Sequence, residues 1–158
     1  DGIRDIGVTG VQTCALPICL RSWQAFRLYL DTLPLEEAIR ECNHLWAYCP
    51  YQKYYLTTDN LENWPNPWEL LHENIYCDLA RALGIVYTLY LTDHNPTVEL
   101  RIYTDKNTNQ EYNLVYLCNG KYVLNYEHDT IVNKQQITKS FRLKKQISIE
   151  ELQLDKIK

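Results

Sequence analysis

Several features that would point to a specific function are missing from this sequence of 158 residues. It contains five glycines, three of them within the first ten residues, so nucleotide hydrolysis through a glycine-rich phosphate loop has no support. No stretch approaches the ~20 apolar residues of a transmembrane helix, and we therefore expect no membrane partner. No Cys-x-x-Cys pair occurs, which removes the spacing typical of zinc ribbons and dithiol redox sites.

An excess of basic residues is missing as well, because the formal net charge is −4. General nucleic-acid-binding domains are usually distinctly basic, so we do not expect nucleic acid as a partner. The basic residues between positions 134 and 145 are interpreted as a solvated strand face. Methionine is absent, whereas tyrosine occurs 13 times, and tyrosine suits both half-buried strands and binding surfaces.

The first 18 residues resemble the conceptual translation of an indexed adapter used in DNA sequencing. DGIRD (1–5) and VTGVQTCALPI (8–18) read back to adapter strings in order and in one frame, and the two residues between them fit a six-base index. The apolar stretch is interrupted, so it does not fit a secretory signal, which needs about 7–15 unbroken apolar residues. We treat residues 1–18 as an adapter-derived artefact and expect them to have no packed role.

The remaining residues, 19–158, are expected to form a single α+β domain that is truncated at its N-terminus. The adapter resemblance implies an assembled sequencing contig, hence a metagenomic source, and the Asn-, Lys-, Ile- and Tyr-rich composition suits a phage protein. Without a secretory signal we expect reduced cysteines and a cytoplasmic location, which is the host cytoplasm for a viral protein.

Hydrophobic periodicity predicts helices in the first half of the chain. Residues 20–31 and 33–49 place apolar side chains at the i, i+3, i+4, i+7 spacing of a core-facing stripe. The third predicted helix spans residues 66–84, with Asn66 as its cap and Glu69 completing a capping box.

After Gly84 the hydrophobic period changes from helical to alternating, which predicts strands. The predicted strands are residues 85–92, 98–104, 111–118 and 121–126, with a further strand at 136–143. Asn119-Gly120 is a strong hairpin signal between two of them, and Ser148 can cap a short final helix. Helices followed by an antiparallel sheet predict the α+β class.

Cys42, His44 and Cys49 invite a zinc interpretation. However, the two cysteines are seven residues apart on one predicted helix, which separates them by about 10 Å along its axis. That is too far for both to bind one tetrahedral ion at about 2.3 Å. We therefore interpret them as core residues and expect neither a metal nor another cofactor.

Cys77 is the candidate nucleophile if the protein is an enzyme, with His128 as base and Asp129 beside it. Its predicted place in the middle of a helix argues against this role, because activated cysteines favour helix N-termini. A separate hypothesis is a module that stacks sugars or bases on aromatic side chains. Its candidate residues are Tyr51, Tyr54, Tyr55 and Trp64.

From Trp68 onward the order of elements resembles the transglutaminase-like branch of the papain-type fold. ARALGIVY (80–87) is similar to the family's long helix ending in Leu-Gly-Ile, and NLVYLCNGKYVLNY (113–126) is similar to a later hairpin. The resemblance implies an α+β fold and acyl-transfer chemistry by a cysteine, a histidine and an aspartate.

The three roles fall on altered residues. The family's cysteine belongs at Trp68 or Glu69, and Cys77 lies about two helical turns beyond that position. The family's histidine falls near Glu111, and its aspartate falls at Asn125. The resemblance therefore implies a degenerate, non-catalytic member. We expect a binding or assembly domain that is not an enzyme, with a protein partner or self-association. The alternatives are a cysteine-dependent hydrolase or transferase of transglutaminase-like type and the stacking module.

Overall fold

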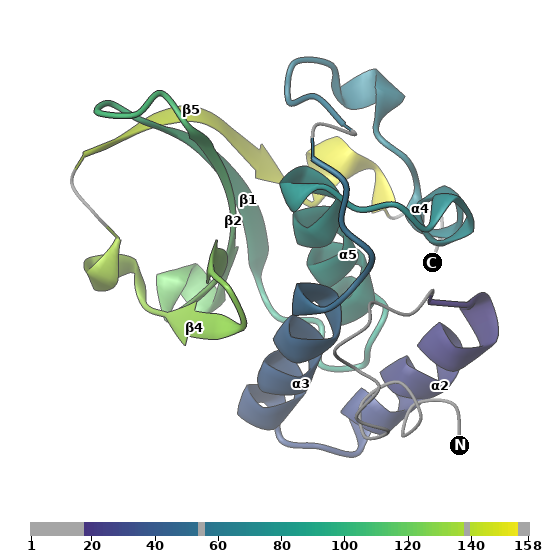
Figure 1. Cartoon of the computed structure of the whole chain (residues 1–158). Coiled ribbons are helices and arrows are strands. Elements are labelled where there is room, and N and C mark those ends of the chain that lie inside the picture. Colours follow the sequence, from purple (N-terminus) through teal and green to yellow (C-terminus); the bar gives the residue numbers. More distant parts are fainter. Residues whose placement is uncertain (1–17, 54–55, 138–139, 155–158) are drawn as a thin grey trace.

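The computed structural model describes residues 18–53, 56–137 and 140–154 (Figure 1). In these ranges four α-helices come first: α2 (Leu20–Asp31), α3 (Leu35–Ala47), α4 (Pro67–Glu73) and α5 (Asp78–Tyr90). Five strands follow: β1 (Val98–Asp105), β2 (Glu111–Leu117), β3 (Tyr122–Glu127), β4 (Thr130–Val132) and β5 (Phe141–Ser148). The predicted α+β class, with N-terminal helices and an antiparallel sheet, is confirmed.

The five strands form one sheet in the order β4-β3-β2-β1-β5, and each neighbouring pair is antiparallel. The predicted hairpin joins β2 to β3, and Asn119 and Gly120 both adopt the positive φ angles that such a turn needs. A register shift after Ile102 interrupts the pairing of β1 with β5. The sheet is strongly curved, and the helices gather on one side of it, with α5 between the sheet and α2 (Figure 1).

Helix α5 is the centre of the core. The indole N–H groups of Trp23 on α2 and Trp46 on α3 both donate to the hydroxyl of Thr88, at 2.9 Å each. The Thr88 hydroxyl in turn donates to the carbonyl of Gly84 at 2.6 Å. A Cβ atom at Gly84 would lie 2.5 Å from the Trp46 ring, so only glycine permits this close approach of α3 to α5. One hydroxyl thus fixes the relative positions of three helices.

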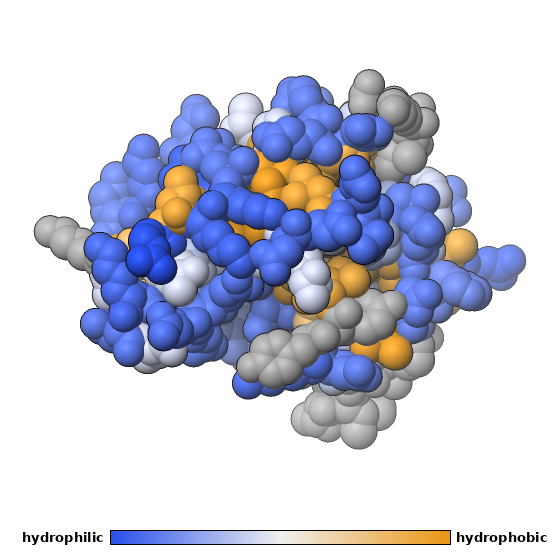
Figure 2. Space-filling view, turned by 90° about the horizontal axis from the view of Figure 1, so that it is seen from above, coloured by the Kyte–Doolittle hydropathy of each residue, from blue (hydrophilic) through white to orange (hydrophobic). Residues whose placement is uncertain are grey.

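The surface differs from this interior. Hydrophilic residues cover most of the face seen from above, and hydrophobic residues gather near its middle (Figure 2). On the side of the sheet away from α5, a smaller apolar cluster contains Leu114, Tyr116 and Val123 with partly buried aromatic residues around them. No helix in the described ranges is long and apolar enough to cross a membrane.

Two sequence-based predictions about the helices are wrong. Residues 85–92, predicted as a strand, form the second half of α5 and its end, and Gly84 lies inside that helix instead of after it. The single helix predicted for 66–84 is divided, because Asn74 adopts a left-handed conformation (φ 57°) and ends α4. Tyr76 then runs extended and pairs in parallel with Tyr51, so α5 begins only after Cys77.

Other boundaries also differ from the prediction. The last strand covers 141–148 instead of 136–143, β4 was not predicted, and the final helix is a 3-10 turn at Glu150–Leu152, with residues 155–158 outside the described ranges. The capping box at the start of α4 is confirmed, with Asn66 and Glu69 exchanging hydrogen bonds of 2.9 and 3.0 Å.

Residues 1–17 lie outside the described ranges, so their predicted lack of a packed role is untested. Ile18, the last residue of the adapter-like stretch, does have one: its side chain is 1% exposed in the main core. Its backbone N–H donates to the side-chain oxygen of Asn74 at 3.1 Å. The expectation therefore does not hold for Ile18.

Candidate functional site

Cys77 occupies the N-cap position of α5, in an extended conformation, and its side chain makes no capping hydrogen bond. This corrects the predicted mid-helix placement. The cause is Asn74, whose left-handed conformation ends α4 and interrupts the predicted helix. The first N–H groups of a helix lack partners within the helix, and the helix dipole makes this end partly positive. Such an end is where reactive cysteines are commonly found.

Two asparagines on neighbouring strands are connected near this end of α5. Asn125 on β3 has a left-handed backbone (φ 68°), and its side-chain amide donates to the carbonyl of Asp78 at 3.0 Å and to that of Asn113 at 2.9 Å. Asn113 on β2 is 6% exposed, and its side-chain oxygen has no hydrogen-bond partner. The amide of Asn125 therefore ties β2 and β3 to the first residue of α5.

The Cys77 thiol is nearly sealed, with the residue 3% exposed. Its hydrogen-bond donor in the described part of the chain is the backbone N–H of Leu56, 3.4 Å from the sulfur. No histidine ring makes a hydrogen bond to this sulfur among the residues that the structure describes. Among the described residues, no histidine or carboxylate is hydrogen-bonded to this thiol to accept its proton.

A small cavity adjoins the start of α5. It has a volume of about 150 Å³, and its lining includes Asp78, Arg81, Asn125, His128 and Asp129. Pockets for drug-sized ligands have volumes of roughly 300–1,000 Å³, so this cavity suits a single side chain.

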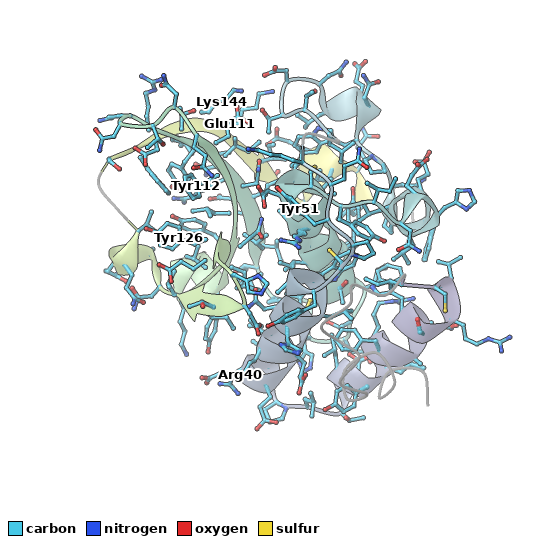
Figure 3. The ribbon with its side chains drawn as sticks, viewed as in Figure 1. Arg40, Tyr51, Glu111, Tyr112, Tyr126 and Lys144 are labelled. Atoms are coloured by element: carbon cyan, nitrogen blue, oxygen red, sulfur yellow. The ribbon has the colours of Figure 1, made fainter. Side chains whose placement is uncertain are left out.

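Tyr51, on the loop after α3, is linked to α5 beside this cavity. The Arg81 guanidinium lies 4.6 Å from the Tyr51 ring centroid, and the Tyr51 hydroxyl donates to Asp78 at 3.4 Å. In Figure 3, Tyr51 lies between the sheet and the helices. Tyr51 is 46% exposed, which leaves much of its side chain open to solvent.

The structure does not join the predicted catalytic residues into a triad. The His128 ring packs edge-on against Tyr48, with 4.9 Å between the ring centroids. The carboxylate of Asp129 makes its hydrogen bond with His44 of α3, at 2.8 Å. His128 and Asp129 thus line the cavity beside Asp78 without a hydrogen bond to Cys77. His44 lies off the apolar stripe of its helix, which was the available signal that its ring faces outward.

The predicted stacking residues are only partly described. Tyr51 contacts Arg81 as above, while Trp64 is half-buried and donates its indole N–H to the carbonyl of Thr57 at 2.8 Å. Tyr54 and Tyr55 lie outside the described residues. The aromatic binding module remains a prediction.

Cys42 and Cys49 belong to the core, as the sequence predicts. Burial raises the pKa of the Cys49 thiol to about 11, although Arg81 acts in the opposite direction. Over the described part of the chain, no group of three or more His, Cys, Asp or Glu side chains is arranged to hold a metal ion. The prediction that the protein needs no metal remains untested.

Comparisons with known proteins give the fold. The sequence matches no protein family and none of the curated proteins. Among solved structures, calcium-bound LapG of Legionella pneumophila matches with a TM-score of 0.60 at 12% identity, covering 82% of this chain and 74% of that chain. A second LapG structure matches with a TM-score of 0.59 at 11% identity, and the match covers 81% of this chain and 73% of that chain. EGTA-treated LapG matches with a TM-score of 0.56 at 12% identity, and the match covers 77% of this chain and 68% of that chain.

Identities this low show a shared fold alone. The likeness to LapG concerns the arrangement of helices and strands, and the transglutaminase-like domain remains a prediction from the sequence. In that resemblance the cysteine belongs at the start of the long helix. Because the structure moves this start from Pro67 to Asp78, the position falls at Cys77 instead of Trp68 or Glu69.

Proposed function

We propose that this chain is a binding domain built on a transglutaminase-like fold, which holds extended polypeptide at the Cys77 site without cleaving it. The observation that carries this proposal is the pair Asn113 on β2 and Asn125 on β3, because the Asn125 amide links the Asn113 backbone to Asp78 at the start of α5. Acyl transfer by a thiol needs a base to take its proton, and an asparagine amide cannot act as one.

The strand positions support this argument. The family resemblance puts a histidine near Glu111, and Asn113 lies two residues further on the same face of β2, since side chains alternate along a strand. Neither residue is an imidazole. The resemblance puts the aspartate at Asn125, where the amide is held by two backbone carbonyls. The cysteine position is kept, and the two positions that would activate it are changed.

Polypeptide is the proposed ligand class because the sequence resembles the transglutaminase-like branch of the papain-type fold, and because the cavity and side chains at the start of α5 suit a peptide. The cavity beside α5 has room for one side chain, and Asp78, Arg81 and Asn125 offer acceptors and donors at its wall. The half-exposed ring of Tyr51 adds an apolar surface at the same place. Backbone amides, one side chain and an apolar contact are what an extended peptide offers in return.

The binding test uses fluorescein-labelled, reduced and carboxymethylated α-lactalbumin as an unfolded polypeptide, followed by fluorescence anisotropy and by gel electrophoresis. We expect saturable binding without fragments, weakened at least threefold in Tyr51→Ala and unchanged in Cys77→Ser. The matched control is Tyr29→Ala, which removes an exposed tyrosine from α2. Absence of binding, or fragments that disappear in Cys77→Ser, would contradict the proposal.

A cysteine-dependent hydrolase or transferase is the second candidate. Its support is the place of Cys77 at the N-terminus of α5 together with the likeness to LapG, and the fold comparisons favour it more directly than they favour binding alone. A shared fold does not carry an activity, because activity depends on the site, so we give the asparagine pair more weight.

Restoring the two altered positions separates the candidates. The double variant Asn113→His with Asn125→Asp places an imidazole on β2 and a carboxylate on β3 in place of the two amides. We expect the wild type to show no hydrolysis of p-nitrophenyl acetate above the Cys77→Ser background, and the double variant to exceed that background at least tenfold. Hydrolysis by the wild type that Cys77→Ser abolishes would favour the enzyme.

A further inference from the structure

Residues 56–59, which we call the strap, run from the Cys77 thiol to side chains of β2 and β5. At one end, the backbone N–H of Leu56 donates to the Cys77 sulfur, and the Leu56 side chain packs against the main core. The Trp64 indole donates to the carbonyl of Thr57 at 2.8 Å. The strap is therefore held at its start by the thiol and the core.

The other end of the strap is held by polar side chains of the sheet. Thr58 is buried, and its hydroxyl donates to the carboxylate of Glu111 on β2 at 3.1 Å. Lys144 on β5 donates to the Thr58 hydroxyl at 3.0 Å and to Asp59 at 3.1 Å, and it also bonds Glu111. Lys145 donates to the carbonyl of Thr58 at 2.8 Å.

The labelled side chains of Lys144 and Glu111 lie together at one end of the curved sheet, as Figure 3 shows. The hydrogen bond to Glu111 raises the pKa of Lys144, so this amine is charged at neutral pH. The side chain of Lys144 is 33% exposed and that of Asp59 is 76% exposed. Contacts of this kind are individually weak and are screened by salt.

We propose that the strap is a gate over Cys77, latched by Lys144, which must open before the thiol becomes accessible. The gate rests on the proposed function for its purpose, since it covers the same polypeptide site. A nearly sealed thiol lies beneath a segment whose anchors on the sheet are partly exposed charges. Opening the strap breaks these polar contacts and releases the Leu56 side chain from the edge of the core.

The test measures alkylation of the native protein by iodoacetamide, with the label at Cys77 quantified by mass spectrometry against the label at Cys118. Both Lys144→Ala and Asp59→Asn should raise the Cys77/Cys118 ratio, by about threefold to tenfold for Lys144→Ala and about twofold for Asp59→Asn. Lys144→Arg should keep the low ratio, and 1 M NaCl should raise the wild-type ratio. Arg142→Ala is the matched control, because it removes an exposed cation from the same strand.

The proposal is overturned if wild-type Cys77 reacts as fast as Cys118, or if Lys144→Ala and Asp59→Asn leave the ratio unchanged. If Lys144→Ala loosens the whole protein, both cysteines react faster and the ratio is no longer informative for that variant. The Cys77/Cys118 ratio of Asp59→Asn then tests the gate, because Asp59 is largely exposed and its replacement leaves the core unchanged. The assay contains no peptide. Its failure is thus distinct from the failure of α-lactalbumin binding, which would overturn the proposed function.

Discussion

Replacing Thr88 by valine should be among the most destabilising single changes in this protein. Valine matches threonine in shape, so the substitution removes the hydroxyl without opening a cavity. In the folded protein that hydroxyl accepts from the indoles of Trp23 and Trp46 and donates to Gly84. Both indoles are buried, so water cannot replace the lost acceptor.

The expected loss follows from the two stranded donors. A buried donor left without a partner costs about 1–3 kcal/mol, so two of them predict a loss of about 2–6 kcal/mol in the free energy of unfolding. For a chain of this size, at about 2–4 °C per kcal/mol, that corresponds to a fall of roughly 4–24 °C in Tm. The effect reaches the site as well, because Thr88 fixes α5, whose first turn follows Cys77.

Urea unfolding followed by tryptophan fluorescence would measure this loss. Thr88→Ser is the matched control, since it keeps the hydroxyl and gives up one methyl group, at a cost of about 1 kcal/mol. Thr32→Val, at an exposed hydroxyl, should change stability by less than about 0.5 kcal/mol. If Thr88→Val costs no more than Thr88→Ser, the inference that this hydroxyl organises three helices is wrong.

Three further predictions follow from the same coordinates. Gly84→Ala should lower the free energy of unfolding by about 1–3 kcal/mol despite the better helix propensity of alanine, because the new methyl group would meet the Trp46 ring at 2.5 Å. A higher Tm of this variant in thermal unfolding would refute the prediction. Asn66→Ala should cost about 1 kcal/mol in urea unfolding, since it removes the cap of α4, whereas Asn60→Ala, at the cap of a short 3-10 turn, should cost less. Cys49, whose pKa is raised to about 11 by burial, should alkylate at pH 8 at least a hundredfold more slowly than a free thiol and accelerate about tenfold per pH unit up to pH 10; mass spectrometry showing rapid labelling at pH 8 would contradict this.

Local patterns predicted much of the fold. The stripes of α2 and α3, the capping box at Asn66 and the hairpin at Asn119-Gly120 depend on neighbouring residues, and all appear in the structure. The second half of α5 was mistaken for a strand because it is buried on every side. Val86, Thr88 and Leu89 point in different directions and are all buried, so no polar face reveals the helical period.

The site was harder to predict for a related reason. Asn74 carries a signal for a helix end, since asparagine tolerates the left-handed conformation, but the long apolar pattern around it favoured one continuous helix. That single boundary decides whether Cys77 lies within a helix or at its N-terminus. The contacts of Asn125 with Asp78 and Asn113 join residues 47 and 12 positions apart, and no local pattern reports such distances.

The strand order has a consequence for how the molecule assembles. Strands β1 to β4 pair with their neighbours in sequence, so each pairing closes a short loop. Strand β5 instead pairs with β1, whose partner residues lie about 40 positions earlier in the chain. Longer loops cost more entropy to close, so β5 should dock late in folding. Since β5 carries Lys144 and Lys145, a newly made chain would pass through a stage in which four strands are paired and the strap lacks its latch to β5.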